Sequence, residues 1–214
     1  MSVIKSVMRI GVVVLAGIIL AQSVRLLMLK HDVSAYKKYW EQQATLPSQS
    51  NSLIYVALGD SAAQGIGASK PQNGYVGLLG NALSAQTGRP VRIVNLSVTG
   101  ATVSDLIHNQ LPMLRHMDLP PDSVVTVEIG ANDMAKFNEI QFKGHIEQLF
   151  SQLPPHTVVA DIPYFGGGRV KGREQNALLA SDIIAEAAGR YRLRLAPLHT
   201  TTKAGDSIGT YGAD

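Results

Sequence analysis

Three short segments of the chain carry residues that could together perform acyl transfer. Ser61 directly follows a short apolar run, where a hydroxyl is well placed to act as a nucleophile. Gly100 lies in a second loop and, lacking a side chain, lets a ligand approach its backbone N–H closely. Asn132 lies in a third loop and offers a neutral carboxamide that can donate to a developing oxyanion. The combination supplies a nucleophile and two or three oxyanion donors, but no base.

Each of these segments, taken alone, is also typical of an ordinary turn. Asp60 is interpreted as a structural group, and Asp133 as a cap of the following helix.

The sequence does not match two other known motifs, one for binding dinucleotide phosphates and one for serine hydrolases. The run that begins at Gly65 starts like a dinucleotide fingerprint, but Lys70 stands at its third glycine position. The GxSxG nucleophile elbow is also absent, because Ala63 stands at its second glycine position.

The chain from residue 53 onward alternates short apolar runs with longer helical stretches. The predicted strands are Leu53–Leu58, Val91–Leu96, Ser123–Ile129, Thr157–Ile162 and Arg192–Ala196. The predicted helices are Gly74–Thr87, Val103–Arg115, Ile140–Gln152 and Arg173–Arg190. This alternation predicts an α/β fold, with a parallel five-stranded sheet and helices on both faces. Functional loops of such sheets follow the carboxyl ends of the strands, so the three polar segments are expected to converge.

The three segments resemble the signature blocks of the SGNH (GDSL-like) hydrolase superfamily. Gly59–Gly65 is similar to its GDSxxxG block, Gly100 to the glycine of its second block, and Gly130–Asp133 to its GxND block. The resemblance covers roughly residues 53–214. It implies a flavodoxin-like three-layer α/β/α sandwich that needs no metal or organic cofactor. It also implies that Ser61 is the nucleophile, and that the Ser61 and Gly100 N–H groups and the Asn132 side chain form the oxyanion hole.

The fourth signature of this superfamily is Asp-x-x-His, in which the histidine is the base and the aspartate orients it. Asp214 fits the first position, and the given sequence holds no histidine after it. The resemblance therefore implies a catalytic role for Asp214. We expect the sequence to be a fragment of a longer protein, and the 214-residue chain by itself to be weakly active or inactive.

Two internal histidines are weighed as substitute bases. His108 follows Asp105 by three residues on one face of a predicted helix, which favours a solvated surface pair. His199 follows the last predicted strand and is the better substitute, although a loop or surface position is favoured for it. Asp161 is interpreted as a structural polar group. A glycine-rich loop near Arg169 is interpreted as solvated, with attraction of an anionic substrate as the alternative.

Positive charge is concentrated at the N-terminus. Residues 1–40 carry six basic and one acidic side chain, whereas the rest carries 13 basic and 15 acidic ones. The domain therefore lacks the basic stripe that nucleic-acid binding requires. Ile10–Ala21 is an unbroken apolar run, and Leu26–Leu29 extends it. We expect residues 1–30 to be a signal anchor with a transmembrane helix, or a cleaved signal peptide; a buried helix is the third interpretation.

Residues 31–52 are predicted to form a juxtamembrane helix and linker. Its Tyr39 and Trp40 belong either at the lipid headgroups or packed against the domain. Residues 53–214 are predicted to be the hydrolase domain, truncated at its C-terminus. An export signal would place this domain outside the cytoplasm, anchored to a membrane or secreted. The absence of cysteine excludes disulfides, thiolate metal sites and a cysteine nucleophile.

The sequence thus predicts a serine esterase that acts on carboxylic esters, with a small-molecule, lipid or glycan ester as its substrate. The N-terminal helix is the expected contact with the membrane, and no cofactor, metal or nucleic acid is expected. Two alternatives stay open. One is a binding module that keeps the fold without catalysis, and the other is an acyltransferase that acts on sugars of the cell envelope.

Overall fold

Five parallel strands form one sheet in the computed structural model, which describes residues 33–47, 49–165 and 173–207. The strands are β1 (Leu53–Gly59), β2 (Val91–Asn95), β3 (Val124–Glu128), β4 (Val158–Ala160) and β5 (Arg194–Ala196). They lie in the order β2-β1-β3-β4-β5. This is the flavodoxin-like order, and the prediction of a parallel five-stranded α/β sheet is confirmed.

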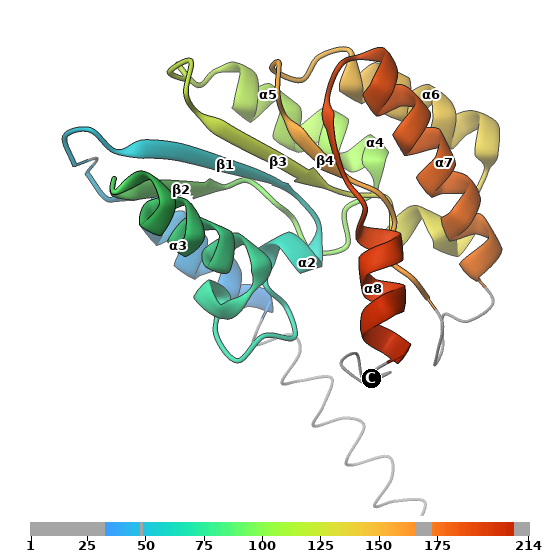
Figure 1. Ribbon diagram of the computed structural model, residues 1–214, viewed down its shortest axis with the longest axis horizontal. Coiled ribbons are helices and arrows are strands. Elements are labelled where there is room, and N and C mark those ends of the chain that lie inside the picture. Colours follow the sequence, from blue (N-terminus) through green and yellow to red (C-terminus); the bar gives the residue numbers. More distant parts are fainter. Residues whose placement is uncertain (1–32, 48, 166–172, 208–214) are drawn as a thin grey trace, which may run out of the picture.

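Helices cover both faces of the sheet (Figure 1). They are α2 (Ser61–Gln64), α3 (Tyr75–Thr87), α4 (Val103–Asp105), α5 (Leu111–Arg115), α6 (Glu139–Phe150), α7 (Glu174–Arg190) and α8 (Leu198–Ser207). Shorter turns are η1 (Pro71–Asn73), the π-helical η2 (Leu106–Gln110) and η3 (Asn132–Lys136). The helix over residues 33–45 and α3 lie on one face, and α4 to α7 lie on the other. The sequence analysis did not predict α8.

Strand β1 lies between β2 and β3, and side chains pack against both of its faces. Tyr55 and Ala57 pack in the cluster that contains Trp40, whereas Val56 and Leu58 point into the larger core. Alternate residues of a strand face opposite sides of a sheet, so a strand covered on both faces must be apolar almost throughout. This burial explains why the run that begins at Leu53 was recognisable as a strand.

The predicted helix Val103–Arg115 is interrupted by one π-helical turn, η2, just before Pro112. Proline has no N–H to donate to the carbonyl four residues earlier, so a regular α-helix cannot continue through it unchanged. The interruption places Gln110 in a fully buried position, with 1% of its surface exposed. The site described below uses this side chain.

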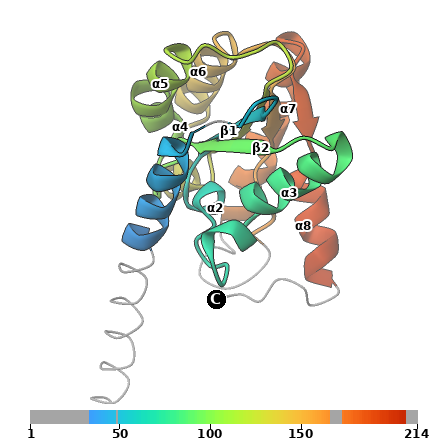
Figure 2. The same ribbon diagram turned by 90° about the vertical axis from the view of Figure 1, so that its left-hand side faces the viewer.

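The helix over residues 33–45 packs against the domain rather than standing apart from it. The Trp40 Nε1–H donates to the carbonyl of Gln64 at 3.0 Å, and the Tyr36 hydroxyl donates to the carbonyl of Ala68 at 2.6 Å. Trp40 is 3% exposed, and Figure 2 shows its helix, in blue, beside α2. Of the two interpretations of Trp40, packing against the domain is therefore the one observed.

The transmembrane segment or signal peptide expected in residues 1–30 lies outside the described residues. Within the described ranges, no helix combines the length and the hydropathy that crossing a bilayer requires.

Candidate active site

Ser61 begins α2 immediately after β1, and Asp60 between them caps this helix. The Ala62 N–H donates to Asp60 Oδ1 at 3.0 Å. Gly59 permits the sharp exit from the strand, because its φ is +153° and a Cβ there would lie 2.3 Å from the carbonyl oxygen of Glu128. The local sequence therefore holds the half-buried Ser61 at the carboxyl edge of the sheet.

The buried amide of Gln110 holds the backbone of Gly59 through two hydrogen bonds. The Gly59 N–H donates to Gln110 Oε1 at 2.9 Å, and Gln110 Nε2 donates to the Gly59 carbonyl at 2.8 Å. This residue was missed by the sequence analysis, because a single glutamine in a helical pattern has no distinguishing signal. Gln110, at the end of η2, therefore holds the last residue of β1 in place just before Ser61.

Replacing Gln110 by leucine is expected to lower the free energy of unfolding by about 1–3 kcal/mol, because the buried Gly59 N–H loses its acceptor and the Gly59 carbonyl loses one of its two donors. Urea unfolding followed by circular dichroism measures this difference. Gln148→Leu on the exposed side of α6 is the matched control and should change stability by less than about 0.5 kcal/mol. Equal effects of the two substitutions would contradict a specific role for Gln110.

The second loop extends the pairing of β1 and β2 beyond the strand ends. The Leu96 N–H donates to the Ala57 carbonyl at 2.8 Å, and the Val98 N–H donates to the Gly59 carbonyl at 3.1 Å. This continued pairing carries the loop along the exit of β1 toward Ser61, and Gly100 follows two residues after Val98.

Gln64 fastens this loop to α2, the helix that Ser61 begins. Its Nε2 donates to the Ser97 carbonyl at 2.9 Å, and its Oε1 accepts from the Thr99 hydroxyl at 2.5 Å. Gly100 then adopts a left-handed φ of +81° and is exposed. In the part of the chain that the structure describes, the backbone N–H groups of Ser61 and Gly100 donate no hydrogen bond. Both are therefore available as donors to a ligand.

Asn132 joins the first and second loops at the start of η3. Its Nδ2 donates to Asp60 Oδ2 at 2.9 Å and to the Ala101 carbonyl at 3.0 Å. The carboxamide therefore contacts both the residue before Ser61 and the residue after Gly100. The three segments selected from the sequence meet at one edge of the sheet. Donation from Asn132 to an oxyanion would require one of the two present bonds to be shared or exchanged.

Asp133 does not cap the helix that follows it, so that interpretation is wrong. Its Oδ2 instead accepts from the Val103 N–H at 3.1 Å, at the start of α4, which precedes it in the chain. Burial raises the pKa of the Asp133 carboxyl. The N–H groups at the start of a helix have no acceptor within that helix, and Asp133 supplies one for Val103.

Asp105 and His108 are both exposed, as the surface interpretation of this pair predicted. Asp105 completes a capping box with Thr102 at the start of α4. These hydrogen bonds from Thr102 lower the pKa of Asp105. His108 Nδ1 lies 2.7 Å from the carbonyl oxygen of Ser104 in its own helix. Among the described residues, neither side chain forms a hydrogen bond with the loop that carries Ser61.

Two buried carboxyl groups, Asp60 and Glu128, lie at the ends of the neighbouring strands β1 and β3, and Asp60 directly precedes Ser61. Asp60 is 2% exposed and Glu128 is 6% exposed. Burial is the largest cause that raises the pKa of both, and the neighbouring charge of Asp60 contributes to raising that of Glu128 to about 8. The sequence analysis read Glu128 only as part of a strand, because alternation along a strand does not reveal which polar residue points inward.

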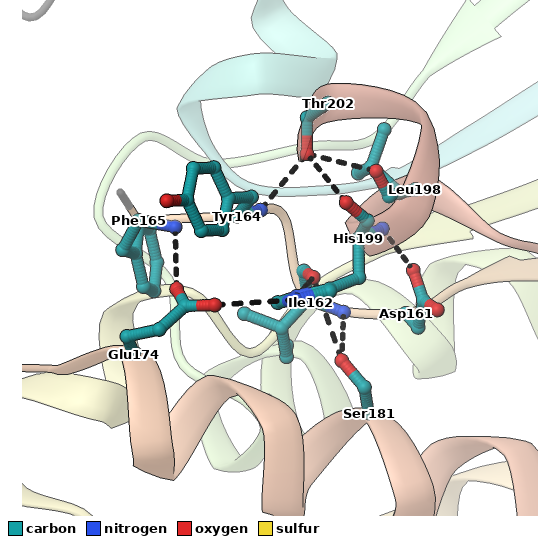
Figure 3. Close-up of polar contacts among 9 residues, drawn as sticks. All are labelled: Asp161, Ile162, Tyr164, Phe165, Glu174, Ser181, Leu198, His199 and Thr202. Atoms are coloured by element: carbon teal, nitrogen blue, oxygen red, sulfur yellow. Dashed lines mark hydrogen bonds and ion pairs between the residues drawn. The ribbon is translucent and has the colours of Figure 1, made fainter. Parts of the chain in front are cut away.

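His199 is buried in the first turn of α8, so the expected loop or surface position is wrong (Figure 3). Its Nδ1 lies 3.2 Å from the Ile162 carbonyl oxygen, and its Nε2 lies 3.2 Å from Glu174 Oε1. The latter contact has the distance of an ion pair without the alignment of a hydrogen bond, since Nε2 has no hydrogen-bond partner. Both ring nitrogens face groups other than Ser61, so His199 does not fit the role of base.

Asp161 has the structural role that was predicted for it. Its Oδ1 accepts from the His199 N–H at 2.7 Å and thereby caps α8 (Figure 3). Asp214, the predicted partner of the base, lies outside the described residues, as does the loop that contains Arg169. His116 and His156 lie before β3 and β4, at the amino ends of the strands, and therefore at the opposite edge from Ser61.

Two pockets border Asn132 and Gly100. One of about 310 Å³ is lined by Asn132, Asp133, Phe137 and His145 among others. The other, of about 160 Å³, is lined by Gly100 and Val98 among others. Space for a ligand is thus available beside Asn132 and beside Gly100.

Comparison with known proteins assigns this arrangement to one family. The family described as "GDSL-like Lipase/Acylhydrolase family" matches residues 57–213. A member of the lipolytic protein G-D-S-L family from Veillonella parvula is similar in structure, with a TM-score of 0.62, 15% identity, and 74% of this chain and 84% of that chain covered.

Two further solved structures share the fold. AlinE4, an SGNH-hydrolase family esterase, has a TM-score of 0.55 and 23% identity, over 78% of this chain and 86% of that chain. Axe2, an acetylxylan esterase from Geobacillus stearothermophilus, has a TM-score of 0.56 and 15% identity, over 76% of this chain and 84% of that one. The search of curated proteins gave no significant match.

Proposed function

Because this chain belongs to the GDSL-like lipase/acylhydrolase family, we propose that it hydrolyses carboxylic esters through an acyl-enzyme formed on Ser61. The observation that carries the proposal is the position of the Asn132 amide. This amide bridges the residue before Ser61 and the residue after Gly100, through bonds of 2.9 and 3.0 Å. These contacts support a site in which the Ser61 hydroxyl, the Gly100 N–H and the Asn132 carboxamide act on one ester carbonyl.

The proposed reaction has two steps. The Ser61 oxygen attacks the carbonyl carbon, a base accepts its proton and passes it to the leaving oxygen, and the alcohol departs to give the acyl-enzyme. Water then attacks the acyl-enzyme while the base accepts its proton, and the carboxylic acid leaves as the proton returns to the Ser61 oxygen. In both steps the negative charge on the carbonyl oxygen is stabilised by the N–H groups of Ser61 and Gly100 and by Asn132. The unpaired state of the two backbone N–H groups supports this role, because no existing bond needs to be broken.

The proposed base is a histidine of an Asp-x-x-His motif that begins at Asp214. Asp214 would hold the imidazole in the tautomer that accepts the Ser61 proton. The buried position of His199, with its ring nitrogens beside the Ile162 carbonyl and Glu174, supports a base from elsewhere in the protein.

A panel of p-nitrophenyl esters of increasing acyl length tests the proposal on the full-length protein. We expect hydrolysis above the uncatalysed rate, with a preference that reports the size of the acyl pocket. Repeating the assay with sugar acceptors distinguishes hydrolysis from transfer, because an acyltransferase would release the same alcohol and form an acylated sugar. Absence of both activities across acetyl, medium and long acyl esters would leave a non-catalytic binding module as the better account.

The membrane association expected from residues 1–30 is part of the proposal. Tyr36 and Trp40 contact the carbonyls of Ala68 and Gln64, in the segment that directly follows Ser61. An anchor in residues 1–30 would therefore hold the Ser61 edge of the domain close to the bilayer, where lipid esters or envelope glycans are within reach. Recovery of the intact protein in the cytosolic fraction of its cell would contradict this anchoring.

A further inference from the structure

We propose that Asp60 and Glu128 share one proton where β1 and β3 end, and that this carboxyl pair positions the Asn132 amide for the reaction. The inference rests on the proposed esterase function. Asp60 and Glu128 are positioning residues in this account, since they act through Asn132 and the Ser61 loop rather than on the substrate.

The sheet itself brings the two carboxyl groups together. In the parallel pairing of β1 and β3, Gly59 lies opposite Glu128, and these are the last residues of the two strands. Asp60, the next residue after Gly59, therefore lies near Glu128. The two side chains are near enough to influence each other's protonation, and each is almost completely buried. Two ionised carboxylates in contact inside a protein repel each other strongly, and such pairs commonly hold one proton between them.

The hydrogen bonds around the pair indicate which carboxyl carries the proton. Asp60 accepts N–H donors on both oxygens, from Ala62 at 3.0 Å and from Asn132 at 2.9 Å, and such donors stabilise a carboxylate. Glu128 Oε2, by contrast, is fully buried and has no hydrogen-bond partner among the described residues. A proton on Glu128 removes this deficit, because the neutral carboxyl group can donate to the Asp60 carboxylate.

The other titratable groups near the pair do not supply a counter-charge. Tyr75 of α3 and Tyr55 of β1 lie on the same side of the sheet, and burial raises the pKa of both hydroxyls, that of Tyr55 to about 12. Asp133 acts on Asp60 with a like charge. Within the described chain, the groups that act on the pair are thus neutral or acidic, which favours the singly protonated state.

The arrangement has a direct consequence for the site. Asp60 Oδ2 is one of the two acceptors that orient the Asn132 amide, and Asp60 Oδ1 holds the first turn of α2 through Ala62. When Glu128 loses its proton, the two carboxylates repel each other and Asp60 is displaced or hydrated. The amide then loses its orientation. The pKa of about 8 for Glu128 places this change at mildly alkaline pH. A decline of kcat through this range, without a matching change in KM, is the expected signature.

The same proton makes the folded state sensitive to pH. The pKa of Glu128 is raised in the folded protein above its ordinary value of 4.5. The folded state therefore binds one more proton than the unfolded state between these two values, and stability must fall as pH rises through this window. The contribution is fully present below pH 4.5 and is lost as pH rises through about 8.

The test compares the full-length protein with Glu128→Gln, which keeps a neutral donor of the same shape toward Asp60. We expect Glu128→Gln to retain kcat within about threefold at pH 7 and to lose the alkaline decline of kcat. Glu128→Leu, which removes the donor, should lower kcat at least tenfold at pH 7 with little change in KM. Glu139→Gln, on an exposed residue of α6, is the matched control and should keep the parental pH profile.

Carboxyl ¹³C NMR of the parent protein reads the pair without any assay of catalysis. A Glu128 carbon resonance that titrates near pH 8, and is missing from the Glu128→Gln spectrum, supports the shared proton. Such a titration in a protein that hydrolyses no ester would contradict the proposed esterase function and would still support the shared proton. An active esterase in which Glu128 titrates near pH 4.5, or in which Glu128→Gln keeps the alkaline decline, would overturn the inference.

Discussion

Replacing Ser61 by alanine is expected to abolish ester hydrolysis by the full-length protein, lowering kcat on the order of 10⁶-fold. The loss is this large because no covalent intermediate can form without the hydroxyl, and the remaining oxyanion donors give only a small residual acceleration. The substitution should not disturb the fold, since the Ser61 hydroxyl makes no hydrogen bond within the described residues. Rates with the best ester of the acyl-length panel measure the effect.

Covalent labelling makes this prediction independent of the choice of substrate. A fluorophosphonate probe should modify the parent protein at Ser61 and leave Ser61→Ala unlabelled. Ser50→Ala, at an exposed position before β1, is the matched control and should be labelled and active like the parent. Labelling at another serine, or equal hydrolysis by Ser61→Ala, would remove Ser61 from the role of nucleophile.

Replacing Asn132 by alanine is expected to lower kcat about 10²–10³-fold, the usual cost of losing one oxyanion donor. The hydrogen bond from the Asn132 amide is strongest when the carbonyl oxygen of the substrate carries negative charge in the transition state, so KM should change little. Asn132→Asp should lower kcat at least as far, because a carboxylate would repel the oxyanion. Initial rates over a range of substrate concentrations separate the two constants.

The structure complicates this substitution in one respect, which the controls address. Asn132 also donates to Asp60 and to the Ala101 carbonyl, so its removal leaves two acceptors without this partner. Thermal unfolding of Asn132→Ala should therefore be measured beside its kinetics. Asn81→Ala, at an exposed position of α3, is the comparison for a substitution of the same size. A kcat equal to that of the parent would show that Asn132 is not an oxyanion donor.

Strands and helices were predictable because their signal is local. The predicted strand Leu53–Leu58 is observed as Leu53–Gly59, and the predicted helix Arg173–Arg190 as Glu174–Arg190. A strand buried on both faces must be apolar along its whole length, and a helix on the sheet must repeat its apolar residues with its own period. Both patterns are written in neighbouring residues. The α8 helix was missed because its sequence, LHTTTKAGDS, has no such apolar repeat.

The convergence of the three loops that carry Ser61, Gly100 and Asn132 was also predictable, for a topological reason. Parallel strands end at one edge of the sheet, so residues that directly follow β1, β2 and β3 must lie near one another. Ser61, Gly100 and Asn132 could therefore be selected before any contact was known. The resemblance to the signature blocks then gave each of them an expected role.

The amino-acid sequence by itself determined the elements, their alternation and the three loops, because each depends on residues close together in the chain. Only the tertiary structure decided which polar groups hold those loops. Gln110 binds Gly59 from 51 positions away, and Asn132 binds Asp60 from 72 positions away. Glu128 meets Asp60 only because β1 and β3 pair in one register. Such contacts produce no periodic pattern in the sequence. A buried polar residue must find a hydrogen-bond partner, but whether it is buried depends on how distant segments of the chain pack together.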